Sequence, residues 1–125
     1  MRLKGLNCII TGGSSGIGAA TVKRFVEEGA HVLIADIDID SANSFADEMG
    51  SSVEAIKCDV RIESDVKAVS DHAYKTWGKV DVLVNNAGSE LNQTYDKTTL
   101  EEWDRVLDTD LKGPWLMCKY IVPGM

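Results

Sequence analysis

The sequence predicts an α/β fold in which one parallel sheet is covered by helices on both faces. Short apolar runs alternate along the chain with longer segments whose apolar residues recur every three or four positions, as on one face of a helix. The short runs are apolar at successive positions and not only at alternate ones, which is typical of strands buried on both faces of a parallel sheet. Strands and helices that alternate in this way predict a doubly wound α/β domain.

The four predicted strands each stop at residues that favour a turn. The first ends in Thr11-Gly12-Gly13, the second at Asp36, the third at Asp59 and the fourth at Asn85-Asn86. The strands cover residues 6–10, 31–35, 53–58 and 80–84. Right-handed crossovers between them predict the strand order 3-2-1-4, with two helices on each face of the sheet.

The four predicted helices cover residues 16–28, 41–49, 62–77 and 98–122. Asp40 or Ser41 can cap the second helix, and Thr98 or Thr99 forms a capping box with the acid three residues further on in the fourth. Gly113-Pro114 should kink or interrupt this fourth helix.

Length, charge and cysteine content restrict the kinds of function. We expect residues 1–125 to form one domain, because the chain is too short for two. The formal net charge of −7 argues against binding to nucleic acid or to an anionic membrane, since both need clustered Lys and Arg. No apolar segment is long enough to span a bilayer or to follow Met1 as a signal peptide. The three widely spaced cysteines predict buried thiols, no metal site and a cytoplasmic protein.

A glycine-rich segment, Thr11-Gly12-Gly13-Ser14-Ser15-Gly16-Ile17-Gly18, lies between the first strand and the first helix. Gly12 permits a tight turn, Gly16 lets the backbone approach a pyrophosphate, and Gly18 lets the helix pack closely on the sheet. A diphosphate is expected at the start of the helix, where free N–H groups and the helix dipole favour an anion. The segment has no Gly-Lys-Ser/Thr, which argues against a triphosphate site, and the alternative is a turn without a ligand.

Asp36 lies 18 residues after Gly18, at the carboxyl end of the second strand. An acid at this place accepts hydrogen bonds from the adenosine ribose hydroxyls and repels a 2′-phosphate. Its neighbours Ala35 and Ile37 provide no positive charge for that phosphate, and Ser15 is the loop residue that could assist. The sequence therefore predicts a Rossmann-type fold that binds NAD rather than NADP. The residues expected to bind the cofactor in these two segments are Gly12, Ser14, Ser15, Gly16, Ile17, Gly18, Asp36 and Ile37. The alternative for Asp36 is a solvated acid.

Four segments together resemble the short-chain dehydrogenase/reductase family. They are Thr11-Gly12-(x)3-Gly16-Ile17-Gly18, Cys58-Asp59-Val60, Asn85-Asn86-Ala87-Gly88 and Trp103-Asp104-Arg105-Val106-Leu107, and the resemblance runs from Leu3 to the last residue. It implies that Asp59 and Val60 contact the adenine, and that Asn86, Ala87 and Gly88 border the cofactor riboses and steady the sheet. It also implies hydride transfer between nicotinamide and a small alcohol or carbonyl substrate.

Two departures from the family pattern stand out. Asp110 occupies the position at which the family's helix carries a catalytic Asn, and an ionised Asp can accept hydrogen bonds but not donate them. The family also uses a catalytic Ser and a Tyr-x-x-x-Lys pair, whereas no tyrosine of this chain has a lysine four residues later. We therefore expect a cofactor-binding part, truncated after the fourth strand and the helix that follows it, that is inactive alone.

Three readings of function stay open at this point. The first is an NAD-dependent oxidoreductase of which this chain is the cofactor-binding part. The second is a non-catalytic dinucleotide-binding module, and the third is a doubly wound domain for another nucleotide, such as a flavin.

The apolar residues of the last two helices predict how the chain packs. Trp77 and Trp103 fall on apolar helix faces, so we expect both indoles to face the core. Trp115, Leu116 and Ile121 are expected to be left uncovered within one chain. The family resemblance implies dimers or tetramers that use this helix, and we expect a homo-oligomer.

Overall fold

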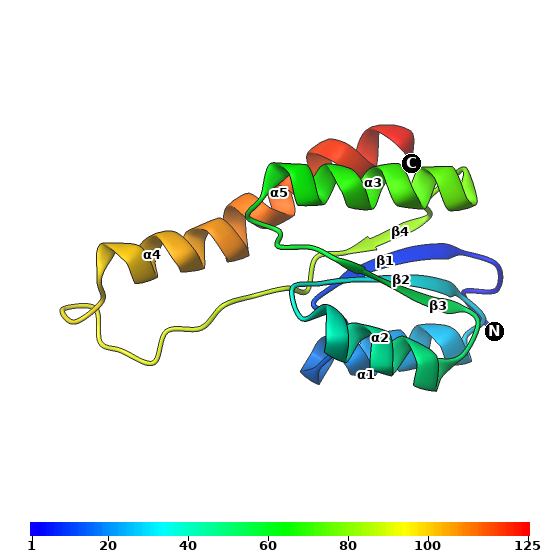
Figure 1. Cartoon of the computed structure of the whole chain (residues 1–125), viewed down its shortest axis with the longest axis horizontal. Helices are drawn as coiled ribbons and strands as arrows, with labels where there is room; N and C mark the ends of the chain where they lie inside the picture. Colours follow the sequence, from blue (N-terminus) through cyan, green and yellow to red (C-terminus); the bar gives the residue numbers. More distant parts are fainter.

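Four parallel strands form the sheet that the sequence predicts. The computed structural model describes all residues 1–125. The strands are β1 (Asn7–Thr11), β2 (His31–Asp36), β3 (Val53–Lys57) and β4 (Val82–Val84). They lie in the order β3-β2-β1-β4, so the predicted order is confirmed (Figure 1). The third strand is one residue shorter than predicted, and the fourth begins two residues later.

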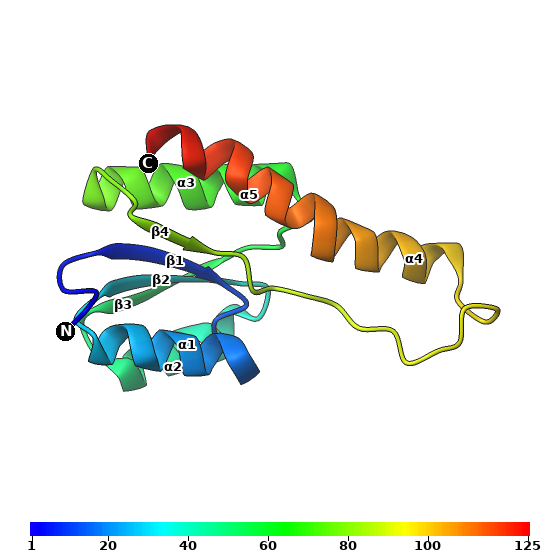
Figure 2. The ribbon, with the colours of Figure 1, turned by 180° about the vertical axis from the view of Figure 1, so that it is seen from behind.

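Helices cover both faces of this sheet (Figures 1 and 2). They are α1 (Gly16–Glu27), α2 (Ile39–Met49), α3 (Glu63–Trp77), α4 (Leu100–Leu107) and α5 (Gly113–Ile121). Ile10 and Ile34 belong to a buried cluster with α1 and α2, whereas their chain neighbours Ile9 and Leu33 belong to a second cluster with α3 and α5. Successive strand residues point to opposite faces. Their apolar character at every position is thus explained by a core on each side.

The last helical segment is continuous but not uniform. A π-helical turn, Asp108–Lys112, separates α4 from α5, and a 3₁₀ turn, Val122–Gly124, follows α5. The helix is interrupted as predicted, but the interruption lies in the five residues before Gly113-Pro114, and the pair itself begins α5. A β-carbon on Gly113 would lie 2.7 Å from Val60 Cγ2, so only glycine lets the helix approach the end of β3 this closely.

The sequence left two possible caps for α2 and for α4, and the hydrogen bonds in the structure identify the cap of each helix. Asp38, not Asp40 or Ser41, caps α2, and its carboxylate accepts from the backbone N–H and the hydroxyl of Ser41 at 3.1 and 2.7 Å. The helix begins earlier than predicted because β2 ends at Asp36 and only a short turn follows. Thr99 caps α4 by accepting from the N–H of Glu102, which confirms one of the two predicted caps.

Three predictions about side-chain burial are wrong. Trp103 is 57% exposed, because α4 projects beyond the sheet and has no core to pack on (Figure 1). Leu116 and Ile121 are buried in the cluster formed by α3, α5 and the sheet, because α5 folds back over that face. Cys118 is exposed on α5 and not buried. Trp77 does pack against the core as expected. No helix is long and apolar enough to cross a membrane.

Candidate functional site

A cleft of about 720 Å³ opens at the carboxyl ends of the four strands. Ligands bind at this edge in open α/β sheets, because loops from strands on either side of a switch in order diverge there. The predicted site residues that line the cleft are Gly12, Ser15, Gly16, Ile17, Asp36, Ile37, Asp59, Val60, Asn86, Ala87, Gly88 and Asp110. Ser14 and Gly18 are predicted site residues that do not line it.

The glycine-rich turn places the start of α1 against the cleft. Gly16 has a φ of +52°, a left-handed conformation that favours glycine, and a β-carbon there would meet nothing within 4 Å. Gly18 lies behind the turn, where a β-carbon would come within 2.6 Å of Asn86 Nδ2 and closer still to the Gly12 carbonyl oxygen. One glycine therefore leaves open space at the cleft, and the other permits close packing.

The first backbone N–H groups of α1 have no acceptor from a side chain. The N-cap residue Ser15 makes no side-chain capping hydrogen bond, and the first turn of α1 contains no acidic residue. The dipole of the helix adds partial positive charge at the same place. The start of α1 can therefore bind an anion in the cleft.

Asp36 lies at the end of β2 and is 8% exposed. Its Oδ2 accepts from the hydroxyl of Ser14 at 2.7 Å and from the N–H of Ser14 at 3.1 Å, and its Oδ1 accepts from the N–H of Asp38 at 3.0 Å. The structure thus places Ser14 against Asp36 and outside the cleft lining.

Asn86 joins the segment after β4 to the turn after β1. Its Nδ2 donates to the carbonyl oxygens of Thr11 and Gly12, both at 3.1 Å. In return, the hydroxyl of Thr11 accepts from the N–H groups of Asn86 and Ala87, both at 3.0 Å. These bonds fix two loops at neighbouring strand ends.

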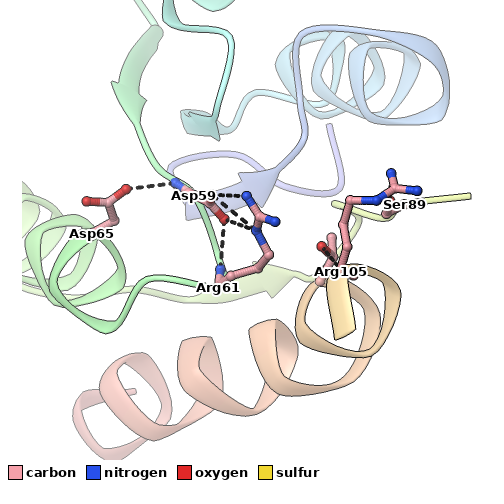
Figure 3. Close-up of polar contacts among 6 residues, drawn as sticks. Asp59, Arg61, Asp65, Ser89 and Arg105 are labelled. Atoms are coloured by element: carbon pink, nitrogen blue, oxygen red, sulfur yellow. Dashed lines mark hydrogen bonds and ion pairs between the residues drawn. The ribbon is translucent and has the colours of Figure 1, made fainter. Parts of the chain in front are cut away.

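Asp59 is paired with Arg61, a cleft residue that sequence reasoning missed (Figure 3). The guanidinium of Arg61 donates to Asp59 Oδ1 at 2.9 Å and to Oδ2 at 2.6 Å, while the N–H of Asp59 donates to Asp65. The hydrogen bonds from Arg61 lower the pKa of the Asp59 carboxyl below its ordinary value. The available signal was a basic residue two positions after a strand-end acid.

Asp110 lines the cleft from the π-helical turn. Its Oδ1 accepts from the N–H of Ser89 at 2.7 Å. Arg105 of α4 donates to the Ser89 hydroxyl at 2.8 Å (Figure 3), and both it and Ser89 line the cleft. Sequence reasoning missed Ser89 and Arg105, because their contact joins a loop to a helix 16 residues away.

Comparisons with known proteins agree with this geometry. The family model of the short chain dehydrogenase matches residues 7–125. Momilactone A synthase of Oryza sativa subsp. japonica is 42% identical over 122 residues, which cover 95% of this chain and 44% of that protein. The 3-oxoacyl-[acyl-carrier-protein] reductase of Thermotoga maritima is 37% identical, over 100% of this chain and 52% of that protein.

A solved structure shares the fold closely. The crystal structure of 3-ketoacyl-(acyl-carrier-protein) reductase from Brucella melitensis, complexed with NADH, superposes with a TM-score of 0.94 at 38% identity. The match covers 98% of this chain and 51% of that one. The chain therefore spans about half the length of the proteins it matches.

Proposed function

Since this chain belongs to the short chain dehydrogenase family, we propose that it is the NAD-binding part of an oxidoreductase. The family binds a nicotinamide cofactor, which when bound supplies or takes the hydride. The proposed substrate is a small alcohol or carbonyl compound. Relatives named as reductases and dehydrogenases, and a structural neighbour crystallised with NADH, support this proposal.

The observation that supports it most strongly is one cleft shared by the start of α1 and the Asp36 carboxylate. The two ends of an adenosine diphosphate need these two groups: N–H donors for the pyrophosphate and an acceptor for the ribose. The free N–H groups after Ser15 and the open space at Gly16 fit the pyrophosphate. The cleft volume is also in the range of small-molecule sites.

The charges around Asp36 favour NAD over NADP. The carboxylate is fixed at the end of β2, and the adjacent Ile37 is exposed and uncharged. The basic side chains that line the cleft are Arg61 and Arg105, and the first of these is already paired with Asp59. A 2′-phosphate at Asp36 therefore meets a negative charge without a compensating cation.

The remaining lining residues have proposed places along the same cofactor. Asp59 and Val60, in the segment that follows β3, contact the adenine beside Ile37. The segment 86–88, after β4, borders the riboses. Ser89 follows this segment, and its N–H donates to the carboxylate of Asp110. A carboxylate accepts hydrogen bonds and offers no donor at this position.

Calorimetric titration of the 125-residue chain with NAD⁺ and NADP⁺ tests the proposal. We expect NAD⁺ to bind about 5- to 150-fold more tightly, the effect of about 1–3 kcal/mol from a repelled or unpaired polar group. Asp36→Ala combined with Ile37→Arg should move the preference toward NADP⁺, because it removes the repulsion and adds a phosphate partner.

Asp40→Ala is the matched control. It likewise removes one carboxylate, but Asp40 is exposed in the first turn of α2 and does not line the cleft. The control should leave the ratio of the two affinities unchanged. Equal or reversed affinities of the unmodified chain for the two cofactors would remove Asp36 from its assigned role.

A further inference from the structure

Ser14 uses both of its hydrogen-bond donors on one oxygen atom. The hydroxyl and the N–H each donate to Asp36 Oδ2, at 2.7 and 3.1 Å. A serine hydroxyl has a single hydrogen, so this bond occupies it fully. The side chain is half-buried and does not line the cleft. Ser14 is therefore placed to act on a bound molecule through Asp36 and not by direct contact.

The carboxylate of Asp36 is consequently fixed at both oxygens. Its Oδ1 accepts from the N–H of Asp38 at 3.0 Å, in addition to the two bonds from Ser14 to Oδ2. A carboxylate has about four acceptor positions, so these three bonds leave one free, on Oδ1. Turning the group away from its place would break bonds of a side chain that is nearly buried.

We propose that Ser14 is a positioning residue that fixes the Asp36 carboxylate and thereby sets the preference for NAD over NADP. This inference rests on the proposed function. A fixed carboxylate presents its free acceptor position to a ribose hydroxyl in one geometry. It also cannot turn aside for a 2′-phosphate, so the repulsion is retained. Ser14 thus acts on both cofactors in opposite directions without touching either.

The test is the ratio of NAD⁺ and NADP⁺ affinities in Ser14→Ala, measured by calorimetry on the 125-residue chain. The alanine keeps the backbone N–H bond to Asp36 and loses only the hydroxyl bond. We expect NAD⁺ to bind about three- to tenfold more weakly, the effect of one hydrogen bond, and NADP⁺ to bind no more weakly than before. The affinity ratio should fall by at least the same factor. A role confined to stabilising the turn would leave this ratio unchanged.

Three further variants make the result specific. Ser14→Thr keeps a hydroxyl and should retain the ratio, and Ser14→Gly removes the hydroxyl a second way if the alanine variant does not fold. Ser44→Ala, on the exposed face of α2, is the control for the same substitution away from the cleft. In the Asp36→Ala background, Ser14→Ala should have no additional effect.

The possible failures are distinguishable. If the unmodified chain binds neither cofactor, the proposed function is wrong, and the role of Ser14 with it. If the chain prefers NAD⁺ but Ser14→Ala leaves the ratio unchanged, or weakens both cofactors equally, the positioning role alone is overturned. An additional loss on Ser14→Ala in the Asp36→Ala background would overturn it as well.

Discussion

Replacing Gly18 by alanine should damage the fold through one defined contact. A β-carbon at Gly18 would come within 2.6 Å of Asn86 Nδ2 and nearer still to the Gly12 carbonyl oxygen. Both neighbours are backbone or are fixed by hydrogen bonds, since Asn86 Nδ2 donates to Thr11 and Gly12 at 3.1 Å. The start of α1 must therefore move away from the Gly12 carbonyl at the end of β1, and Asn86 must give up a hydrogen bond.

The expected loss in the free energy of unfolding follows from these two changes. Overpacking a well-filled site costs about 1–3 kcal/mol, and a lost buried hydrogen bond costs about 1 kcal/mol. We therefore expect Gly18→Ala to lower the free energy of unfolding by about 2–4 kcal/mol. For a chain of this length, that corresponds to a melting temperature lower by about 8–16 °C.

Thermal and urea unfolding followed by circular dichroism measure this difference. Gly88→Ala is the matched control, because the nearest atom to its β-carbon would be Asp110 Oδ1 at an ordinary 3.6 Å and its φ is not positive. The control should stay within about 1 kcal/mol of the unmodified chain. If Gly18→Ala melts as the control does, the turn and α1 do not depend on close approach at this position.

Three further expectations concern binding, pH and assembly. Gly16→Val should abolish NAD⁺ binding and keep most of the helical circular dichroism signal, because the valine side chain would fill the open space at the start of α1. An unchanged affinity for NAD⁺ would mean that the glycine-rich loop is only a turn. Arg61→Met should be less stable than the unmodified chain at pH 7, and urea unfolding should show this difference shrinking as the pH falls below about 4. Arg61 lowers the pKa of Asp59, and the pair stabilises the fold only while Asp59 is ionised. A stability difference that does not depend on pH would exclude the ion pair as its cause. The exposed apolar residues of α4 and the π-helical turn predict self-association, so the sedimentation coefficient should depend on protein concentration. The double variant Trp103→Lys, Leu111→Lys should abolish this dependence. A monomer at every concentration of the unmodified chain would contradict the prediction.

Much of the cleft could be predicted from sequence because its position depends on chain order. Parallel strands direct their carboxyl ends to one edge, so residues that follow an apolar run must meet there. Asp36 is the last residue of β2, Asp59 and Asn86 each lie two residues after a strand, and all three line the cleft. Gly16 was also predictable, because glycine lets the backbone at the start of a helix approach a pyrophosphate.

The side-chain pairs at the cleft could not be predicted in the same way. Arg61 pairs with Asp59 and Arg105 with Ser89 through rotamers of long side chains, which periodicity does not specify. Ser14 was predicted to contact the cofactor, whereas its hydroxyl points to Asp36. The choice between these two partners depends on the conformation of a turn, and the sequence pattern is the same for both.

Trp103 shows a related limit of periodicity. The spacing correctly identifies residues that share one face of a helix, but it does not identify what that face meets. Trp103 is 57% exposed, since α4 projects beyond the sheet (Figure 2). Trp77 obeys the same spacing and packs on the core, because α3 lies along the sheet.

The position of Asp110 at the cleft depends on the buried cluster that α3 and α5 form with one face of the sheet. Asp110 lies on the π-helical turn, and α5 begins three residues later, at Gly113. α5 is fixed by buried Met117 and Ile121, and by the Tyr74 hydroxyl, which donates to the Ile121 carbonyl at 2.6 Å. Because interiors are close-packed and transmit displacement, a change in how α5 packs on α3 must also move Asp110. The contact between Asp110 and Ser89 therefore depends on residues that never reach the cleft.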